Sequence, residues 1–259
     1  MTNPSTQIDL AANTIQEKLT FVLIHGAWAT ASFWDNTAAV LREAGHTVHA
    51  PEYAGHGNNI DPQVTHEQIV SSVVDYITQE NIQDFVLVGH SFGGTVIAKV
   101  AEFVSDRVKR LVFFDAFVPK DGESLLDQMP APVQQAFHGL IQASGNNTIT
   151  LPFPLFRDTF VNRANLHLAK QIYEASPAEP AGPLLHKLDL KKFYSLQIPK
   201  SYLFLTEDIA YPPAPFAFHP GQSSNLGVYR LIVSDGDHIS TAYTHANVLA
   251  QKLVEAGRD

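Results

Sequence analysis

The stretch DFVLVGHSFGG, residues 84–94, decides the fold class. An apolar run ends in a glycine-rich turn, and helical spacing follows it, so we predict a strand, a sharp turn and a helix. The turn carries the pattern G-x-S-x-G at Gly89, Ser91 and Gly93. In such a turn the serine hydroxyl is exposed, and the glycines let strand and helix approach closely. Ser91 is therefore a candidate nucleophile, and the Phe92 amide at the start of the helix is a candidate oxyanion donor.

The same apolar character recurs in short runs along the chain. These runs are Thr20–His25, Thr47–Ala50, Asp84–Gly89, Arg110–Asp115, Ser201–Thr206 and Val228–Val233. Most are continuously apolar, which is typical of strands buried on both faces. Between them lie segments with helical spacing, namely Ser32–Ala44, Thr65–Gln79 with a capping box at Thr65 and Gln68, and Ile239–Ala256. This alternation predicts an α/β fold with a doubly wound, mainly parallel sheet.

One long segment interrupts the alternation. Residues 119–192 are rich in proline and contain no clear buried strand, and they are too long for a plain loop. We predict a helical cap inserted into the core, with helices at Val133–Ser144 and Val161–Ala175. The core then consists of residues 19–118 and 193–259, and residues 1–18 form a lead-in without a functional role.

Composition removes several classes of function. The 259 residues contain no cysteine, which excludes thiol nucleophiles, disulfides and cysteine-ligated metal centres. The formal charge of −9 is the wrong sign for a nucleic-acid partner. No apolar run is long enough for a membrane span, and the first twenty residues lack the pattern of a signal peptide. We therefore expect a cytoplasmic protein that acts on a small molecule away from membranes. The histidines form no convincing metal cluster, so we expect neither metal nor cofactor.

A serine nucleophile needs a general base, and His238 is the best candidate among twelve histidines. It follows the last predicted strand, so it lies at the carboxyl end of the sheet, as Ser91 does. His90 adjoins Ser91, but consecutive residues of a tight turn point in different directions. The acid that orients the imidazole is expected at Asp208, after the strand that ends at Thr206, which gives the order serine, acid, histidine. Glu207 and Asp115 are its rivals.

The second oxyanion donor is expected on the loop after the first strand. His25-Gly26-Ala27-Trp28 occupies that place, with the Ala27 amide as the donor and Trp28 as part of the pocket. Phe117 and Tyr211 are further candidates for the pocket wall. The segment 119–192 adds aromatic side chains at Phe137, Phe153, Phe156 and Phe160.

With these residues in place, the chain resembles the α/β-hydrolase superfamily, in particular plant methylesterases, hydroxynitrile lyases and bacterial esterases. The resemblance rests on FVLIHGAW, PEYAGHG, GHSFGG, LFLTED and SDGDH. It implies an α/β-hydrolase fold with a cap, a triad of Ser91, Asp208 and His238, and oxyanion amides at Ala27 and Phe92. The lyases carry threonine and lysine where this chain has Gly26 and Ile239, which disfavours cyanohydrin cleavage.

We therefore expect a serine hydrolase that cleaves a small hydrophobic or aromatic ester, or a lactone, through an acyl-enzyme. Two alternatives stay open at this point. One is a cofactor-independent dioxygenase or a lyase that uses the histidine and aspartate as a base. The other is a ligand-binding receptor with slow turnover. A homodimer is compatible with the sequence, which does not decide the oligomeric state.

Overall fold

A parallel six-stranded sheet organises the molecule, which a computed structural model describes over residues 17–213 and 215–259. The strand order is β2-β1-β3-β4-β7-β8, and every paired neighbour runs parallel. The strands are β1 (Thr20–Ile24), β2 (Thr47–His49), β3 (Phe85–His90), β4 (Val108–Phe114), β7 (Lys200–Leu205) and β8 (Arg230–Ser234). All six predicted runs are strands, with ends that move by one or two residues. Most of the predicted lead-in, residues 1–16, lies outside the described residues.

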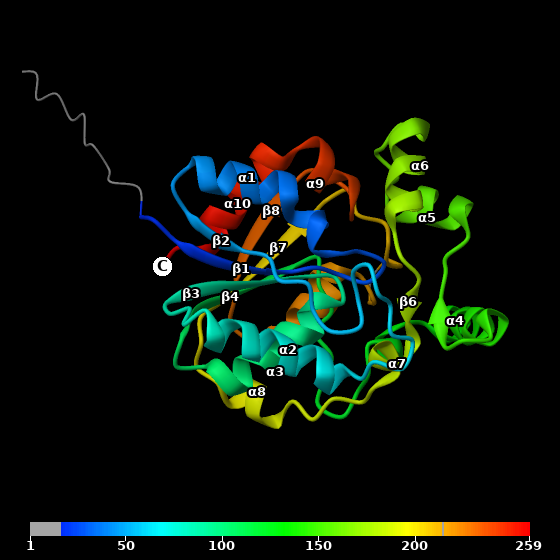
Figure 1. Cartoon of the computed structure of the whole chain (residues 1–259), viewed down its shortest axis with the longest axis horizontal. Coiled ribbons are helices and arrows are strands. Elements are labelled where there is room, and N and C mark those ends of the chain that lie inside the picture. Colours follow the sequence, from blue (N-terminus) through cyan, green and yellow to red (C-terminus); the bar gives the residue numbers. More distant parts are fainter. Residues whose placement is uncertain (1–16, 214) are drawn as a thin grey trace, which may run out of the picture.

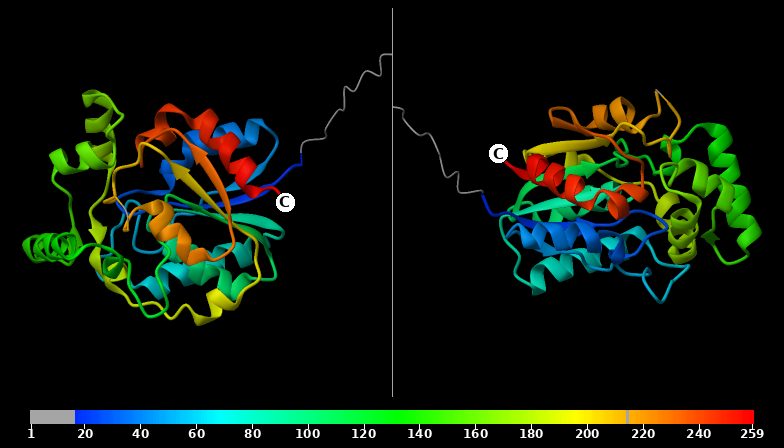
Figure 2. Two further views of the ribbon diagram at one scale, coloured as in Figure 1. Left: turned by 180° about the vertical axis from the view of Figure 1, so that it is seen from behind. Right: turned by 90° about the horizontal axis from the view of Figure 1, so that it is seen from above.

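Helices cover both faces of this sheet (Figures 1 and 2). One face carries α1 (Asp35–Glu43), α9 (Ser240–Thr244) and α10 (Ala246–Gly257), and the other carries α2 (His66–Gln79), α3 (Gly93–Val104) and α8 (Lys191–Ser195). The predicted doubly wound α/β class is therefore confirmed. Thr65 caps α2 in a capping box with Gln68, as expected. The single helix predicted at Ile239–Ala256 is wrong, because His245 has a non-helical backbone (φ −131°, ψ 37°) that separates α9 from α10.

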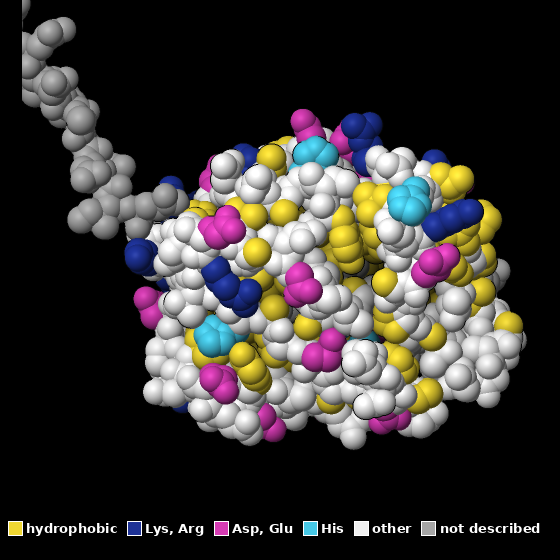
Figure 3. Space-filling view, turned by 45° about the horizontal axis from the view of Figure 1, so that its top comes forward, with side chains coloured by type: hydrophobic (Ala, Val, Ile, Leu, Met, Phe, Trp, Pro, Cys, Tyr) yellow, Lys and Arg dark blue, Asp and Glu magenta, His cyan; other side chains and the backbone are white. Residues whose placement is uncertain are grey.

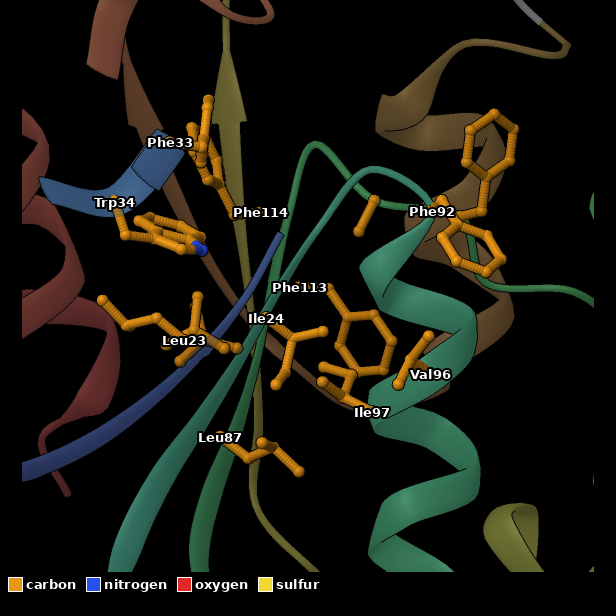
Figure 4. Packing of buried hydrophobic residues seen from close by; sticks show 14 of the residues in the cluster. Leu23, Ile24, Phe33, Trp34, Leu87, Phe92, Val96, Ile97, Phe113 and Phe114 are labelled. Atoms are coloured by element: carbon orange, nitrogen blue, oxygen red, sulfur yellow. The ribbon is translucent and has the colours of Figure 1, made fainter. Parts of the chain in front are cut away.

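The core lies between the sheet and these helices (Figure 4). Successive residues of a strand point to opposite faces, so Phe113 packs toward Ile97 of α3, whereas Phe114 packs on the side of Trp34. All four side chains are fully buried. Most strands are covered on both faces and are therefore largely apolar, which explains the continuous runs in the sequence. The edge strand β8 differs, because it leaves Leu231 and Val233 exposed.

The segment predicted as a cap lies beyond the carboxyl ends of the strands (Figures 1 and 2). It contains a 3-10 turn at Leu126–Gln128 and the helices α4 (Ala131–Ser144), α5 (Phe153–Thr159), α6 (Leu166–Ala175) and α7 (Ala181–Leu185). Outside it, short 3-10 turns occur at Ala31–Trp34 and Ser223–Leu226, and a wide turn at Phe218–Gln222. Two short strands, β5 (Thr148–Ile149) and β6 (Glu179–Pro180), pair antiparallel. The sequence showed no strand here, because two residues carry no detectable period.

One of the two helices predicted in this segment needs correction. The predicted helix Val161–Ala175 begins only at Leu166, where the Asn165 side chain accepts a hydrogen bond from the Leu168 amide and caps α6. Helix α5, which the sequence analysis missed, precedes it. The boundaries 119 and 192 themselves stay a prediction. Within the described part of the chain, none of the helices combines the length and hydropathy needed to cross a bilayer.

Candidate active site

Ser91 lies in a strained turn between β3 and α3. Its φ angle of +53° is in the left-handed region, which costs a residue with a side chain about 1–2 kcal/mol. The turn is held by its backbone, since the Ser91 amide donates to the Phe114 carbonyl (3.1 Å) and the Ser91 carbonyl accepts from the amides of Gly94 and Phe117. A Cβ on Gly89 would lie 2.5 Å from the Gly93 carbonyl oxygen, so only glycine fits there. The chain therefore holds this serine in a fixed, high-energy conformation.

Three side chains from the carboxyl ends of three strands meet at this turn. The Ser91 hydroxyl lies 2.9 Å from Nε2 of His238, and Nδ1 of His238 lies 2.6 Å from Oδ2 of Asp208. Because a carboxylate only accepts, Nδ1 carries the proton, which leaves the Nε2 lone pair to accept from the serine. The side chains of His238 and Asp208 are almost completely buried. The structure thus brings together the three predicted residues in the geometry of a nucleophile, its base and an orienting acid.

The imidazole of His238 is held from several sides. The Phe218 ring stacks on it at 5.2 Å, and the Phe160 ring meets it edge-on at 5.3 Å. Nε2 of His90 donates to the His238 carbonyl (2.9 Å), and the Ile239 amide donates to the Phe160 carbonyl (3.0 Å). Complete burial holds the pKa of His90 well below its usual range, so that ring is neutral. His90 therefore supports the loop of His238. The sequence analysis predicted that its side chain does not face Ser91.

The two rival acids occupy different surroundings. Glu207 turns away from the hydrogen-bond chain of Ser91, His238 and Asp208 and pairs with Nε of Arg163 at 3.2 Å, where both side chains are partly exposed. Asp115 follows β4 and lies behind the triad, with ligand-type atoms of Asp115, Asp208 and His238 within 4.8 Å of one another. Among the described residues, these three side chains are near enough to one another to hold a metal ion. The hydrogen bonds that Asp208 makes with His238 and Asp115 account for the short distances.

Asp115 is a buried acid next to another carboxylate. It is fully inaccessible, and it accepts from the Leu205 amide through both oxygens (3.1 and 3.2 Å). Burial raises the pKa of Asp115 well above its usual range, and the charge of Asp208 raises it further. Two adjacent carboxyl groups do not both ionise cheaply, so Asp115 is the neutral partner that donates to Asp208. Two further titratable side chains lie near it, namely His238 and Tyr202, whose hydroxyl is bonded to the backbone of Ala116.

This burial predicts a pH-dependent stability effect of Asp115→Asn. A raised folded-state pKa stabilises the protein fully below the ordinary pKa of the acid, and this contribution is lost as the pH rises toward the folded value. Asparagine never ionises, keeps an acceptor for the Leu205 amide and keeps a donor toward Asp208. We expect the difference in melting temperature, variant minus wild type, to increase by about 3 °C or more from about pH 4 to about pH 8. A difference that stays constant over this range in thermal scans would show that Asp115 ionises freely in the folded protein.

The loop after β1 lies directly against Ser91. A Cβ on Gly26 would lie 2.8 Å from Cβ of Ser91, so the turn has no room for a larger residue. Trp28 follows with a φ angle of +54°. No acceptor among the described residues takes up the amides of Ala27 and Phe92, although both residues are buried and line the same cavity as Ser91. Two unpaired amides beside a nucleophile are the arrangement that an oxyanion hole requires.

A cavity of about 420 Å³ opens above Ser91. It contains every side chain predicted for the substrate pocket, Trp28, Phe117 and Tyr211, together with Ser91 and His238. Of the four cap phenylalanines named from the sequence, Phe137 and Phe160 line it. Phe153 and Phe156 instead pack on Tyr173 inside the cap. In the space-filling view, hydrophobic side chains gather on the cap side of the molecule (Figure 3).

Most of the cavity wall was not predictable from the sequence. The additional apolar lining residues include Leu125, Met129, Val133, Leu140, Leu151, Leu184, Ile209 and Phe218. They come from the cap and from the loop after β7, and no local pattern distinguishes them from ordinary core residues. None of the described residues that line the cavity is Asp, Glu, Lys or Arg. The site therefore suits an uncharged, apolar ligand.

Comparison with known proteins assigns the chain to a family. A family model described as "Alpha/beta hydrolase family" matches residues 21–257. The carbendazim hydrolyzing esterase of Nocardioides sp. (strain SG-4G) is 42% identical over 113 residues, which are 42% of this chain and 47% of that enzyme. The alpha-hydroxynitrile lyase of Arabidopsis thaliana is 38% identical over 114 residues, 40% of this chain and 42% of the lyase. The matches thus span about half the length of these curated relatives.

A solved structure resembles nearly the whole chain. It is described as "Extracellular alpha/beta-hydrolase from Paenibacillus species shares structural and functional homology to Tobacco Salicylic Acid Binding Protein 2". It is 63% identical with a TM-score of 0.92, and the match covers 93% of this chain and 100% of that one. Plant methylesterases also match. The resemblance to plant methylesterases, hydroxynitrile lyases and bacterial esterases is therefore confirmed.

Proposed function

We propose that this chain, which belongs to the alpha/beta hydrolase family, hydrolyses carboxylic esters through an acyl-enzyme on Ser91. One observation carries the proposal: the Ser91–His238–Asp208 hydrogen-bond chain lies at the base of an apolar cavity, beside two amides that find no acceptor among the residues the structure describes. Ester hydrolysis through a serine needs these parts, namely a nucleophile, a base with an orienting acid and an oxyanion hole.

The reaction follows from this geometry. Nε2 of His238 takes the proton of Ser91 while its oxygen forms a bond to the ester carbonyl carbon. The carbonyl oxygen becomes an oxyanion, and the Ala27 and Phe92 amides donate to it. The tetrahedral adduct then expels the alcohol, which receives the proton from His238. Water repeats the sequence on the acyl-serine and releases the carboxylic acid. Asp208 holds the imidazole and stabilises its charged form throughout.

The apolar cavity supports an uncharged substrate with a hydrophobic or aromatic acyl group. A volume of about 420 Å³ accommodates a single-ring acid with a small alcohol, and phenylalanine and tryptophan edges offer favourable contacts to a ring. The Paenibacillus hydrolase is described as sharing function with a salicylic acid binding protein, and salicylic acid is an aromatic acid. We therefore place small aromatic esters first among the candidate substrates.

A matched pair of esters tests this substrate class. We expect kcat/KM for methyl benzoate to exceed that for the analogue with a para-carboxylate by about 100-fold or more, because the apolar wall has no group that compensates the charge. Release of methanol, measured with purified protein at neutral pH, gives both values. Equal values, or a preference for the charged ester, would contradict the proposed pocket.

The structure also bears on the alternatives. Gly26 takes the place of the lyase threonine, and a Cβ there would approach Ser91 within 2.8 Å, so this turn has no room for such a hydroxyl. Ile239 is apolar and buried, and it supplies no amine. No feature of the described residues favours a dioxygenase or a receptor over the esterase. The cytoplasmic location expected from the sequence stays a prediction, and the Paenibacillus relative is described as extracellular.

A further inference from the structure

Two histidine–glutamate pairs lie behind the turn that carries Ala27. Nε2 of His25 is 2.7 Å from Glu52, and Nε2 of His56 is 3.1 Å from Oε1 of Glu179. The side chains of His25, His56 and Glu179 are completely buried, whereas Glu52 is one-third exposed. Tyr53 lies between the two rings, stacked on His25 at 4.0 Å and edge-on to His56 at 4.5 Å. Glu179 therefore brings a buried charge from the cap segment to the core, at a place that the mechanism does not use.

The carboxylate of Glu179 makes hydrogen bonds with two residues of the core. Its Oε1 faces His56, and its Oε2 accepts from the backbone amide of Trp28 at 2.9 Å. Trp28 directly follows Ala27 and has the unfavourable φ angle of +54°. The Trp28 indole donates to the Ile149 carbonyl (2.9 Å). The short strands β6 and β5 of the cap thus hold Trp28 at its amide and at its ring.

The hydrogen bonds of His56 indicate how Glu179 is itself held. Nδ1 of His56 lies 3.1 Å from the Ala54 carbonyl, which only accepts, and Nε2 faces the carboxylate of Glu179. Both nitrogens are therefore donors, and the ring is a cation paired with a buried carboxylate. Burial works to lower the pKa of His56, but Glu179 outweighs it through its charge and hydrogen bond, and the pKa is raised. Such a pair fixes the position of the carboxylate more closely than a neutral contact would.

We propose that Glu179 is a positioning residue of the oxyanion hole: fixed by His56, it holds the Trp28 amide and thereby keeps the adjacent Ala27 amide directed at the oxyanion. This inference rests on the proposed ester hydrolysis. Glu179 is not among the residues that line the cavity, so it acts through the turn and not through the substrate. The cap then has a second role besides shaping the pocket, because β6 completes the support of the catalytic turn.

Two isosteric variants test the proposal. Glu179→Met fills the same volume but has no acceptor, whereas Glu179→Gln keeps an acceptor for the Trp28 amide and a donor for a neutral His56. We expect Met to lower kcat by about 10- to 100-fold with KM within about threefold, and Gln to restore most of the loss. Binding of an aryl trifluoromethyl ketone, which forms an oxyanion on Ser91, should weaken by the same factor as kcat. Glu67→Ala is the control, because it breaks the exposed contact with His186 and leaves the turn alone.

Hydrogen exchange at the Trp28 amide separates this inference from the proposed function. Its exchange should accelerate by about tenfold or more in Glu179→Met and stay near the wild-type rate in Glu179→Gln. Hydrogen exchange can be measured even if the wild-type protein hydrolyses no ester. The proposed function would then be wrong, and the exchange rates would still show whether Glu179 holds the Trp28 amide. Unchanged exchange, a Gln variant as impaired as Met, or a rise in KM at constant kcat would each overturn the proposal. If the Met variant does not fold, Glu179→Ala, which likewise has no acceptor for the Trp28 amide, replaces it with the same expectations.

Discussion

Ser91→Ala should lower kcat for ester hydrolysis by about 10⁴-fold or more, to a residual rate that only the oxyanion hole and binding sustain. The variant loses the atom that forms the bond to the acyl carbon, and within the described part of the chain no second hydroxyl is hydrogen-bonded to the His238 ring. Alanine tolerates the φ angle of +53° no worse than serine, since both carry a Cβ, so the fold should persist. Initial rates with a small aromatic ester, at matched protein concentrations, measure the effect.

The control for this variant is Ser195→Ala, which changes an exposed serine on α8 and should stay within about twofold of wild type. Activity of Ser91→Ala above a few per cent would instead favour proton abstraction by His238 and Asp208 without a serine nucleophile, as in a dioxygenase. Ligand binding without hydrolysis in the wild type would favour the receptor. Each result therefore assigns the site to one of the three alternatives.

Asp208→Asn should lower kcat by about 10³- to 10⁴-fold, because it reverses the tautomer of His238. Oδ1 of Asp208 accepts from the Ala210 amide at 2.8 Å, so the amide oxygen of an asparagine is held there and its NH₂ group faces Nδ1. Nδ1 must then accept, the proton moves to Nε2, and Nε2 no longer takes the proton of Ser91. The loss should appear in kcat, with KM changed little, in a full Michaelis–Menten analysis.

Glu207→Gln is the matched control, since it removes the adjacent carboxylate while its partner Arg163 stays at the surface. We expect its kcat within about twofold of wild type, because the contribution of exposed ion pairs is small. If Glu207→Gln abolished activity and Asp208→Asn retained it, the acid of the triad would have to be reassigned.

The fold was largely predictable because local and global signals agree in this chain. The run Phe85–Val88 before the turn is apolar at every position, and such a run is consistent with a strand covered on both faces. Gly89 and Gly93 stand where backbone approaches backbone, so the pattern G-x-S-x-G reports a steric requirement. Asp208 and His238 were found because each follows a strand, and carboxyl ends of parallel strands meet at one edge of the sheet.

The parts that escaped prediction depend on contacts between distant segments. Glu179 reaches Trp28 across 151 positions of the chain, and nothing in its sequence neighbourhood distinguishes it from a surface glutamate. Asp115 was considered only as a rival acid, and its neutral state follows from burial beside Asp208, which appears only once β4 and β7 are paired. The break at His245 and the start of α6 at Leu166 likewise depend on backbone angles and capping that overrule helical spacing.

Covalent labelling shows whether the Ser91 hydroxyl is the nucleophile. Wild-type protein treated with a fluorophosphonate should gain the mass of one adduct, and peptide mapping should place that adduct on Ser91, with no adduct in Ser91→Ala. Label on any other residue, or an unlabelled protein that still hydrolyses esters, would contradict the account.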